Sequence, residues 1–190
     1  FVSIAGHTMR EGKWEKKAYG KGIELQGKTL GIVGFGRIGQ HLGVMAKAIG
    51  MDVIAFDIFH IPGIEEKLGI PYVEMDELLA KSDFISVHAP AVDGGALINA
   101  ERIAKMKDGV VFIDNARGEL MDIDAVTEAV ESGKFGALFM DAFPGETGII
   151  HVPHDEDIIR TPGMPYFKLK YLRSFVNVYH TPHMAFFTEE

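Results

Sequence analysis

Three residues with complementary chemistry, Arg117, Glu146 and His183, each come a few residues after an apolar run of the sequence. An arginine guanidinium can bind a carboxylate through two hydrogen bonds and polarise a neighbouring carbonyl. A histidine can pass a proton to or from a carbonyl oxygen, and a carboxylate beside it favours the imidazolium form and orients the ring. Together these groups suit chemistry on a carbonyl that carries a carboxylate, as in a 2-keto acid.

Each of the three residues also has an ordinary structural interpretation. A histidine after a strand is often a hydrogen-bonded structural residue. Arg117 taken alone is as readily a surface residue, and Glu146 a solvated loop residue. The functional interpretation is favoured because all three follow predicted strands and because the chain also carries a nucleotide-binding pattern.

Strand and helix patterns alternate along the chain from Lys28 onward. The expected strands are Thr29–Gly34, Met51–Phe56, Ile70–Val73, Phe84–His88, Val110–Asp114, Ala137–Asp141 and Phe175–Tyr179. The expected helices are Arg37–Ile49, Ile64–Leu68, Met75–Lys81, Ala100–Met106 and Asp124–Glu131, with a further short one over Pro165–Arg173. This alternation predicts an α/β fold, a doubly wound parallel sheet of the Rossmann type, with ligands at the carboxyl ends of the strands. A long irregular stretch, Phe143 to about Met164, is expected to be a functional loop or to hold short helix.

The sequence Gly34-x-Gly36-x-x-Gly39 lies between the first predicted strand and the first predicted long helix, and Asp57 ends the next strand. This is the dinucleotide-binding fingerprint in the context that it requires. The glycines allow a tight turn, a close approach to a pyrophosphate and close helix packing, while the helix N-terminus attracts the phosphates. A carboxylate at Asp57 accepts a hydrogen bond from a ribose hydroxyl and repels a 2′-phosphate, which predicts NAD over NADP. The alternative is a glycine-rich turn without a ligand.

Four motifs together resemble the D-isomer-specific 2-hydroxyacid dehydrogenase family. They are Gly34–Gly39 with Asp57, Asn115-Ala-Arg117-Gly, Asp141-Ala-Phe-Pro-Gly-Glu146, and Thr181-Pro-His183-Met-Ala. The resemblance runs from about Gly27 to Glu190. It implies that Arg117 binds and polarises the substrate, that Glu146 partners the histidine, and that His183 is the acid and base. The cofactor-binding residues implied by the fingerprint and the resemblance are Gly34, Gly36, Arg37, Ile38, Gly39, Asp57, Ala89, Pro90, Asn115, Ala116 and Asp141.

The reaction implied by the resemblance is NAD-dependent interconversion of a 2-keto acid and a D-2-hydroxy acid. The long spacing from Glu146 to His183 is similar to that of the D-lactate dehydrogenase branch. The complete enzymes of the family also have a substrate domain, most of which is absent from this chain, so the isolated chain can be inactive. The alternative is an NAD(H)-binding module, similar to a corepressor-like sensor, without turnover.

We therefore expect residues 1–27 to form an entry arm or hinge, residues 28–183 to form the NAD-binding domain, and residues 184–190 to begin the return to the substrate domain. The arm carries charged residues around Trp14 and is a candidate contact in a homodimer, with an isologous arrangement. Equally, Trp14 can pack onto its own domain.

The amino-acid composition of the chain limits the classes of partner that it is expected to bind. The 190 residues carry a net charge of −8 at pH 7, and a chain without a basic stripe is a poor candidate for binding nucleic acid. The chain has no cysteine, which is compatible with a cytoplasmic location, and no apolar run long enough to cross a membrane. A metal site built from His151, His154, His180 and His183 is a weaker alternative, because no carboxylate completes a usual ligand pattern. We therefore expect no metal, and small 2-keto or 2-hydroxy acids as partners.

Overall fold

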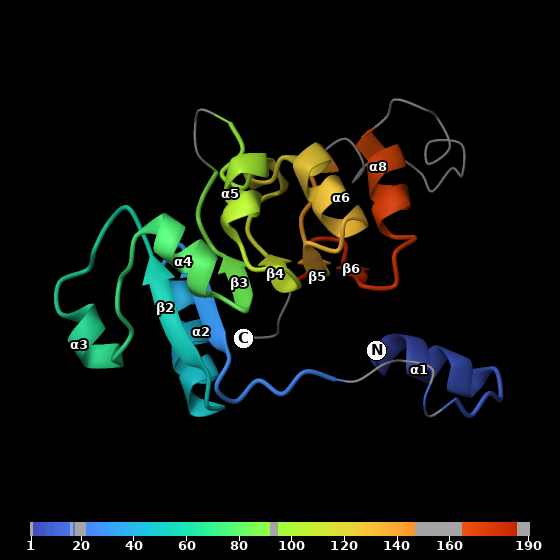
Figure 1. The fold of residues 1–190 in the computed structure, drawn as a ribbon, viewed down its shortest axis with the longest axis horizontal. Helices are drawn as coiled ribbons and strands as arrows, with labels where there is room; N and C mark the ends of the chain where they lie inside the picture. Colours follow the sequence, from blue (N-terminus) through green and yellow to red (C-terminus); the bar gives the residue numbers. More distant parts are fainter. Residues whose placement is uncertain (1, 16, 18–21, 92–94, 147–164, 186–190) are drawn as a thin grey trace.

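A computed structural model describes residues 2–15, 17, 22–91, 95–146 and 165–185. Its centre is a six-stranded sheet in which every pair of neighbours is parallel, in the order β2-β1-β3-β4-β5-β6 (Figure 1). The strands are β1 (Thr29–Val33), β2 (Asp52–Phe56), β3 (Phe84–Val87), β4 (Val110–Asp114), β5 (Phe135–Met140) and β6 (Val178–His180). The helices are α1 (Val2–Arg10), α2 (Arg37–Ala48), α3 (Ile64–Leu68), α4 (Met75–Lys81), α5 (Ala100–Lys105), the 3-10 helix η1 (Gly118–Leu120), α6 (Ile123–Glu131) and α8 (Pro165–Leu172). The predicted Rossmann-type parallel sheet is confirmed.

Strand β1 shows how the two faces of the sheet are covered. Leu30 and Ile32 belong to the core cluster beneath α2, whereas Val33 belongs to the cluster that includes the α4 residue Leu78. Gly31 also faces α4, and a Cβ there would lie 2.6 Å from the Leu78 side chain. Because successive strand residues point to opposite faces, this apolar run buries both of its sides.

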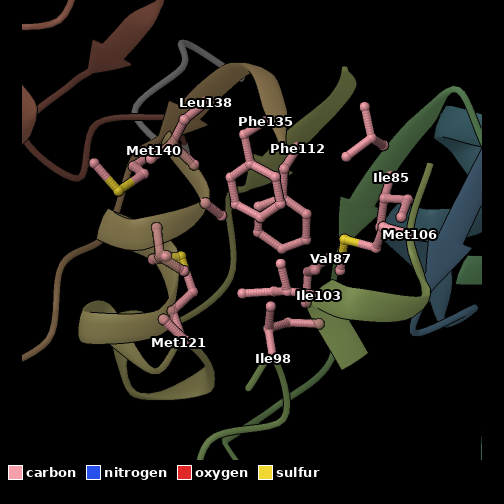
Figure 2. Close-up of a cluster of buried hydrophobic side chains, with 14 of the residues drawn as sticks. Ile85, Val87, Ile98, Ile103, Met106, Phe112, Met121, Phe135, Leu138 and Met140 are labelled. Carbon is pink, nitrogen blue, oxygen red and sulfur yellow. The ribbon is translucent and has the colours of Figure 1, made fainter. Parts of the chain in front are cut away.

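Helices α4, α5, α6 and α8 form a row along one face of the sheet (Figure 1). Beneath the row, Phe112 of β4 and Phe135 of β5 stack with their ring centroids 5.1 Å apart, and both are fully buried. Figure 2 shows these rings beside Ile98 and Ile103, at the centre of the larger hydrophobic cluster. This packing fixes the strand ends that carry the candidate site.

The other face of the sheet is covered by α2 over β1 and β2, and beyond α2 it forms an apolar groove. The groove has a volume of about 810 Å³ and is lined by side chains such as Phe84, Val111, Ile113 and Phe139. Phe139 stacks on Tyr179 across β5 and β6, with their ring centroids 4.6 Å apart.

Two strand predictions were wrong. The expected strand Ile70–Val73 makes only a single bridge between Tyr72 and Ala55, because Pro71 has no N–H to continue a ladder. The last strand is Val178–His180, three residues long and shifted from the predicted Phe175–Tyr179. Phe175 lies in the turn after α8, where its carbonyl accepts a hydrogen bond from the N–H of Val178.

The N-terminal segment, predicted to be an entry arm or hinge, contains the nine-residue helix α1. This helix ends at Arg10 and lies apart from the sheet in Figure 1. Trp14 is 81% exposed, so the alternative in which it packs onto its own domain is wrong. Most of the predicted loop, from residue 147 to residue 164, lies outside the described residues.

Candidate active site

The sheet order reverses between β1 and β3, and this switch point brings the turn after β1 against the segment after β3. Gly34 has a φ of +94°, which favours glycine, and a Cβ there would lie 2.5 Å from the backbone nitrogen of Ala89. Ala89, which was predicted with Pro90 to lie beside the cofactor, therefore adjoins the glycine turn. A crevice outside the strand ends at such a point is where α/β sheets bind dinucleotides.

The N-terminus of α2 has the form of a phosphate-binding turn. Gly36, Arg37 and Ile38 are exposed there, and no side chain of the described residues caps the helix N-terminus. A Cβ on Gly36 would meet nothing within 4 Å, whereas one on Gly39 would lie 2.4 Å from the carbonyl oxygen of Gly34. Gly39 thus permits close packing of helix on strand, and Gly36 leaves room for an approaching pyrophosphate. These residues fit a dinucleotide.

Asp57 follows β2 and is held by two backbone groups. Its Oδ2 accepts a hydrogen bond of 2.6 Å from the N–H of Phe35, and its Oδ1 accepts one of 2.9 Å from the N–H of Phe59. The carboxylate is thereby fixed beside the glycine turn, in the place that a ribose-binding acid requires. Each oxygen has further acceptor capacity for a hydroxyl donor.

The structure brings Glu146 and His183 together. Glu146 Oε1 contacts His183 Nδ1 as an ion pair when the ring is protonated, and the side chains are 18% and 28% exposed. The other carboxylate oxygen, Oε2, accepts a hydrogen bond of 3.0 Å from the N–H of Phe143. The glutamate is therefore anchored at one oxygen and orients the imidazole with the other.

The turn that carries His183 is built on Asp141. The Asp141 carboxylate accepts hydrogen bonds from the Thr181 hydroxyl at 2.5 Å, from the N–H of Met184 at 3.0 Å and from the N–H of Ala185 at 2.8 Å. The N–H of His183 donates to the Asp141 carbonyl at 2.7 Å. Burial alone would raise the pKa of Asp141, but these hydrogen bonds and the nearby His183 outweigh it and lower that pKa.

His183 itself has a φ of +50°, a left-handed conformation that costs a non-glycine residue free energy and that clusters at functional sites. The hydrogen bonds of Asp141 to the turn overcome this cost. Asp141 was predicted to lie toward the nicotinamide, and the structure shows it as the buried anchor of the histidine turn. Its contact with the cofactor stays a prediction.

The backbone next to Arg117 contacts the segment that carries Glu146. A Cβ on the next residue, Gly118, would lie 2.1 Å from the backbone carbon of Phe143, so the two segments touch where only glycine fits. Phe143 is the residue whose N–H binds Glu146. The exposed Arg117 guanidinium donates to the carbonyl of Ala116 at 2.9 Å, and its contact with a substrate stays a prediction, as do those of Asn115 and Ala116 with the cofactor.

Sequence reasoning missed Asp114, the last residue of β4. Its side chain is fully buried. Burial is the largest cause that raises the pKa of Asp114, and together with Glu119 and Glu146 it raises this pKa to about 7. It also missed Thr181, the donor to Asp141. The sequence feature that could have identified Asp114 is an aspartate at the end of an otherwise apolar strand.

Two further predictions concern metal ions and membranes. His151 and His154 lie outside the described residues, and the described part of the chain holds no cluster of three metal-binding side chains. Among the same residues, none of the helices has the length and apolar character needed to cross a bilayer.

Comparison with known proteins gives a consistent assignment. Residues 2–185 match the family described as D-isomer specific 2-hydroxyacid dehydrogenase, NAD binding domain. The chain is 44% identical over 191 residues to a hydroxypyruvate reductase of Thermotoga maritima, a match that covers 100% of this chain and 56% of the relative.

Solved structures agree with this match. The pyruvate reductase of Chlamydomonas reinhardtii superposes with a TM-score of 0.89 at 39% identity, over 100% of this chain and 56% of that one. A D-lactate dehydrogenase of Aquifex aeolicus, solved with NAD and lactic acid, gives 0.83 at 34% identity, over 99% and 56%. The chain thus spans about half the length of these relatives. It belongs to the D-isomer specific 2-hydroxyacid dehydrogenase family and spans that family's NAD binding domain, in agreement with the family and the cofactor predicted from its motifs.

Proposed function

We propose that the protein is an NAD-dependent oxidoreductase that interconverts a small 2-keto acid and the corresponding D-2-hydroxy acid. The single observation that carries this proposal is the contact of the Glu146 carboxylate with Nδ1 of His183, at the strand ends of a dinucleotide-binding sheet. NADH, when bound, supplies the hydride. The chain's own task is to bind the acid, place its carbonyl and provide the proton.

The proton is assigned to His183. With Nδ1 directed to Glu146, proton exchange with a substrate takes place at Nε2. Reduction of the carbonyl consumes one proton, which protonated His183 donates to the carbonyl oxygen. Oxidation of the hydroxy acid is the reverse and requires the neutral ring. The negative charge of Glu146 stabilises the protonated form during reduction.

The substrate carboxylate is assigned to Arg117. Its guanidinium is exposed, and the next residue, Gly118, lies against the backbone of the segment that carries Glu146. A guanidinium binds carboxylates in a planar, bidentate manner. We propose pyruvate as the substrate, as expected for an enzyme similar to D-lactate dehydrogenases. Hydroxypyruvate, which the name of the Thermotoga relative indicates, is the competing substrate.

The test is an assay of NADH oxidation by the intact protein with pyruvate, hydroxypyruvate and longer 2-keto acids, with the product resolved by chiral chromatography. We expect the D-isomer, and a rate that falls by about 100-fold in Glu146→Gln and further in His183→Ala. The matched control is Asp52→Asn, which makes the same kind of change at an exposed strand residue.

Two results would contradict the proposal. Near-native turnover in His183→Ala would remove the assigned proton donor. Binding of NADH, measured by calorimetry, without turnover of any 2-keto acid by the intact protein would instead identify an NAD(H)-binding module.

A further inference from the structure

Asp114 is a buried carboxyl in a place where a carboxyl is costly. It ends β4 after the apolar residues Val110–Ile113, and its exposed fraction is zero. Its Oδ1 accepts a hydrogen bond of 2.8 Å from the N–H of Ala116, and the N–H of Arg117 also acts on this carboxyl. Its Oδ2 is the one buried side-chain polar atom without a hydrogen-bond partner among the residues that the structure describes. Buried polar atoms are nearly always paired, so this exception calls for an explanation.

The turn that Asp114 binds is the turn that presents Arg117. Ala116 and Arg117 give their N–H groups to the carboxyl, and Gly118 then lies against the backbone of Phe143. A hydrogen bond to the residue two positions on is typical of an aspartate that fixes a turn. These hydrogen bonds of Asp114 therefore fix the position of the Arg117 backbone.

The ionisable groups around Asp114 come from every element packed against it. Glu119 on η1 and Glu146 after β5 both act on it, and both are carboxylates. Asp141, at the end of β5, donates its N–H to the Asp114 carbonyl at 3.0 Å, and its carboxylate is committed to the histidine turn. His88 follows the paired strand β3 and bonds to Ser86. The charged side chains that act on Asp114 therefore disfavour a further negative charge.

We propose that Asp114 is a positioning residue for Arg117 and, by carrying its proton on Oδ2, keeps a second negative charge out of the region where the substrate carboxylate binds. This inference rests on the proposed function, because it assumes that Arg117 binds an anionic substrate. With the proton in place, Oδ1 still accepts from the turn, and the contact of the Glu146 carboxylate with His183 is retained.

Ionisation of Asp114 then opposes the binding of the substrate more than it opposes the chemical step. A new negative charge beneath the Arg117 turn repels a carboxylate held by that residue, whereas His183, which exchanges the proton at Nε2, keeps its contact with Glu146. Burial, followed by Glu119 and Glu146, raises the pKa of Asp114 to about 7, so this change falls in the neutral range. The KM for a keto acid is expected to rise above that pH while kcat changes less.

The test uses the intact protein and its Asp114→Asn variant, with pyruvate as the probe, from pH 5.5 to 9. Asparagine keeps an acceptor for the turn but cannot ionise. We expect the KM of the wild type to rise on the order of tenfold across neutral pH, and the KM of Asp114→Asn to stay near its low-pH value. Asp52→Asn is the control, because it makes the same substitution at an exposed residue and should keep the wild-type profile.

A second measurement observes the proton directly and does not need activity. Carboxyl carbon NMR of the wild-type chain should show one aspartate that titrates near neutral pH, and this signal should be absent from Asp114→Asn. A KM rise that persists in Asp114→Asn, or an Asp114 that titrates in the ordinary range of aspartates, overturns the inference. If the wild type turns over no 2-keto acid, the proposed function fails, while the NMR titration still decides whether Asp114 carries the proton.

Discussion

The substitution Asp114→Asn should stabilise the fold at alkaline pH and leave it little changed at acid pH. The pKa of Asp114 rises from 3.8 to about 7 on folding, because burial and two neighbouring carboxylates disfavour its ionised form. The folded state therefore binds a proton more tightly than the unfolded state does. The stability that this proton contributes is fully present below pH 3.8 and is lost as the pH rises through about 7.

The magnitude follows from the size of the shift. A difference of about three pKa units corresponds to roughly 4 kcal/mol of unfolding free energy, lost in the wild type between acid pH and pH 8. Asparagine cannot ionise, so the variant avoids this loss. The advantage of the variant should grow by about 3 kcal/mol between pH 5 and pH 8. This is a large share of the total stability of an ordinary domain.

The assay is urea unfolding followed by circular dichroism at several pH values, with the wild type, Asp114→Asn and Asp52→Asn compared. The m-value should stay constant, so that the midpoint reports stability. Asp52 is exposed, and its substitution should leave the pH dependence of the wild type intact. Parallel curves for Asp114→Asn and the wild type from pH 5 to pH 8 would refute the reasoning, because they would show that Asp114 does not hold its proton in the folded state.

Two further predictions concern the cofactor turn and the core. Gly34→Ala should weaken NADH binding by at least about tenfold in calorimetry, because its Cβ would lie 2.5 Å from a backbone nitrogen and its φ is +94°. Gly63→Ala, with a φ of +74° and open space around it, is the control and should bind NADH like the wild type. Phe112→Ala should lower the free energy of unfolding by about 3–5 kcal/mol in urea, because it removes a fully buried ring that stacks on its neighbour. A loss below about 1 kcal/mol would mean that the core closes around the cavity.

The sequence was sufficient to predict the parts of the fold that depend on local patterns. Apolar runs bounded by turns located β1, β2 and β4 to within one residue, and the glycine fingerprint located the N-terminus of α2. These features can be predicted from the sequence because a strand buried on both faces and a glycine turn each require particular residue types. The pairing of Glu146 with His183 was implied by the resemblance to the family, and the two side chains are in contact in the structure.

The sequence was not sufficient where hydrogen bonding decides the conformation. Phe175 is a strand-forming residue by type, but its carbonyl closes a turn with Val178, and β6 begins only there. Pro71 lies in an apolar run, but its missing N–H limits pairing to one bridge. The left-handed conformation of His183 could not be predicted from the sequence either, because it depends on the Asp141 carbonyl, which accepts a hydrogen bond from the N–H of His183 at the end of another strand.

The two aspartates at the ends of β4 and β5 show why residue type alone could not assign the site. Asp114 and Asp141 are both buried, and the N–H of Asp141 donates to the carbonyl of Asp114. Asp141 receives a hydroxyl and two N–H groups from the histidine turn, so the ionised form is favoured and its pKa is lowered. Asp114 has one oxygen without a donor among the residues that the structure describes. Its burial and the carboxylates Glu119 and Glu146 raise its pKa. Burial, donors and neighbouring charges therefore give these two neighbouring aspartates different charge states below neutral pH. Asp141 keeps its negative charge beneath the His183 turn, whereas Asp114 carries a proton and adds no negative charge beneath the Arg117 turn.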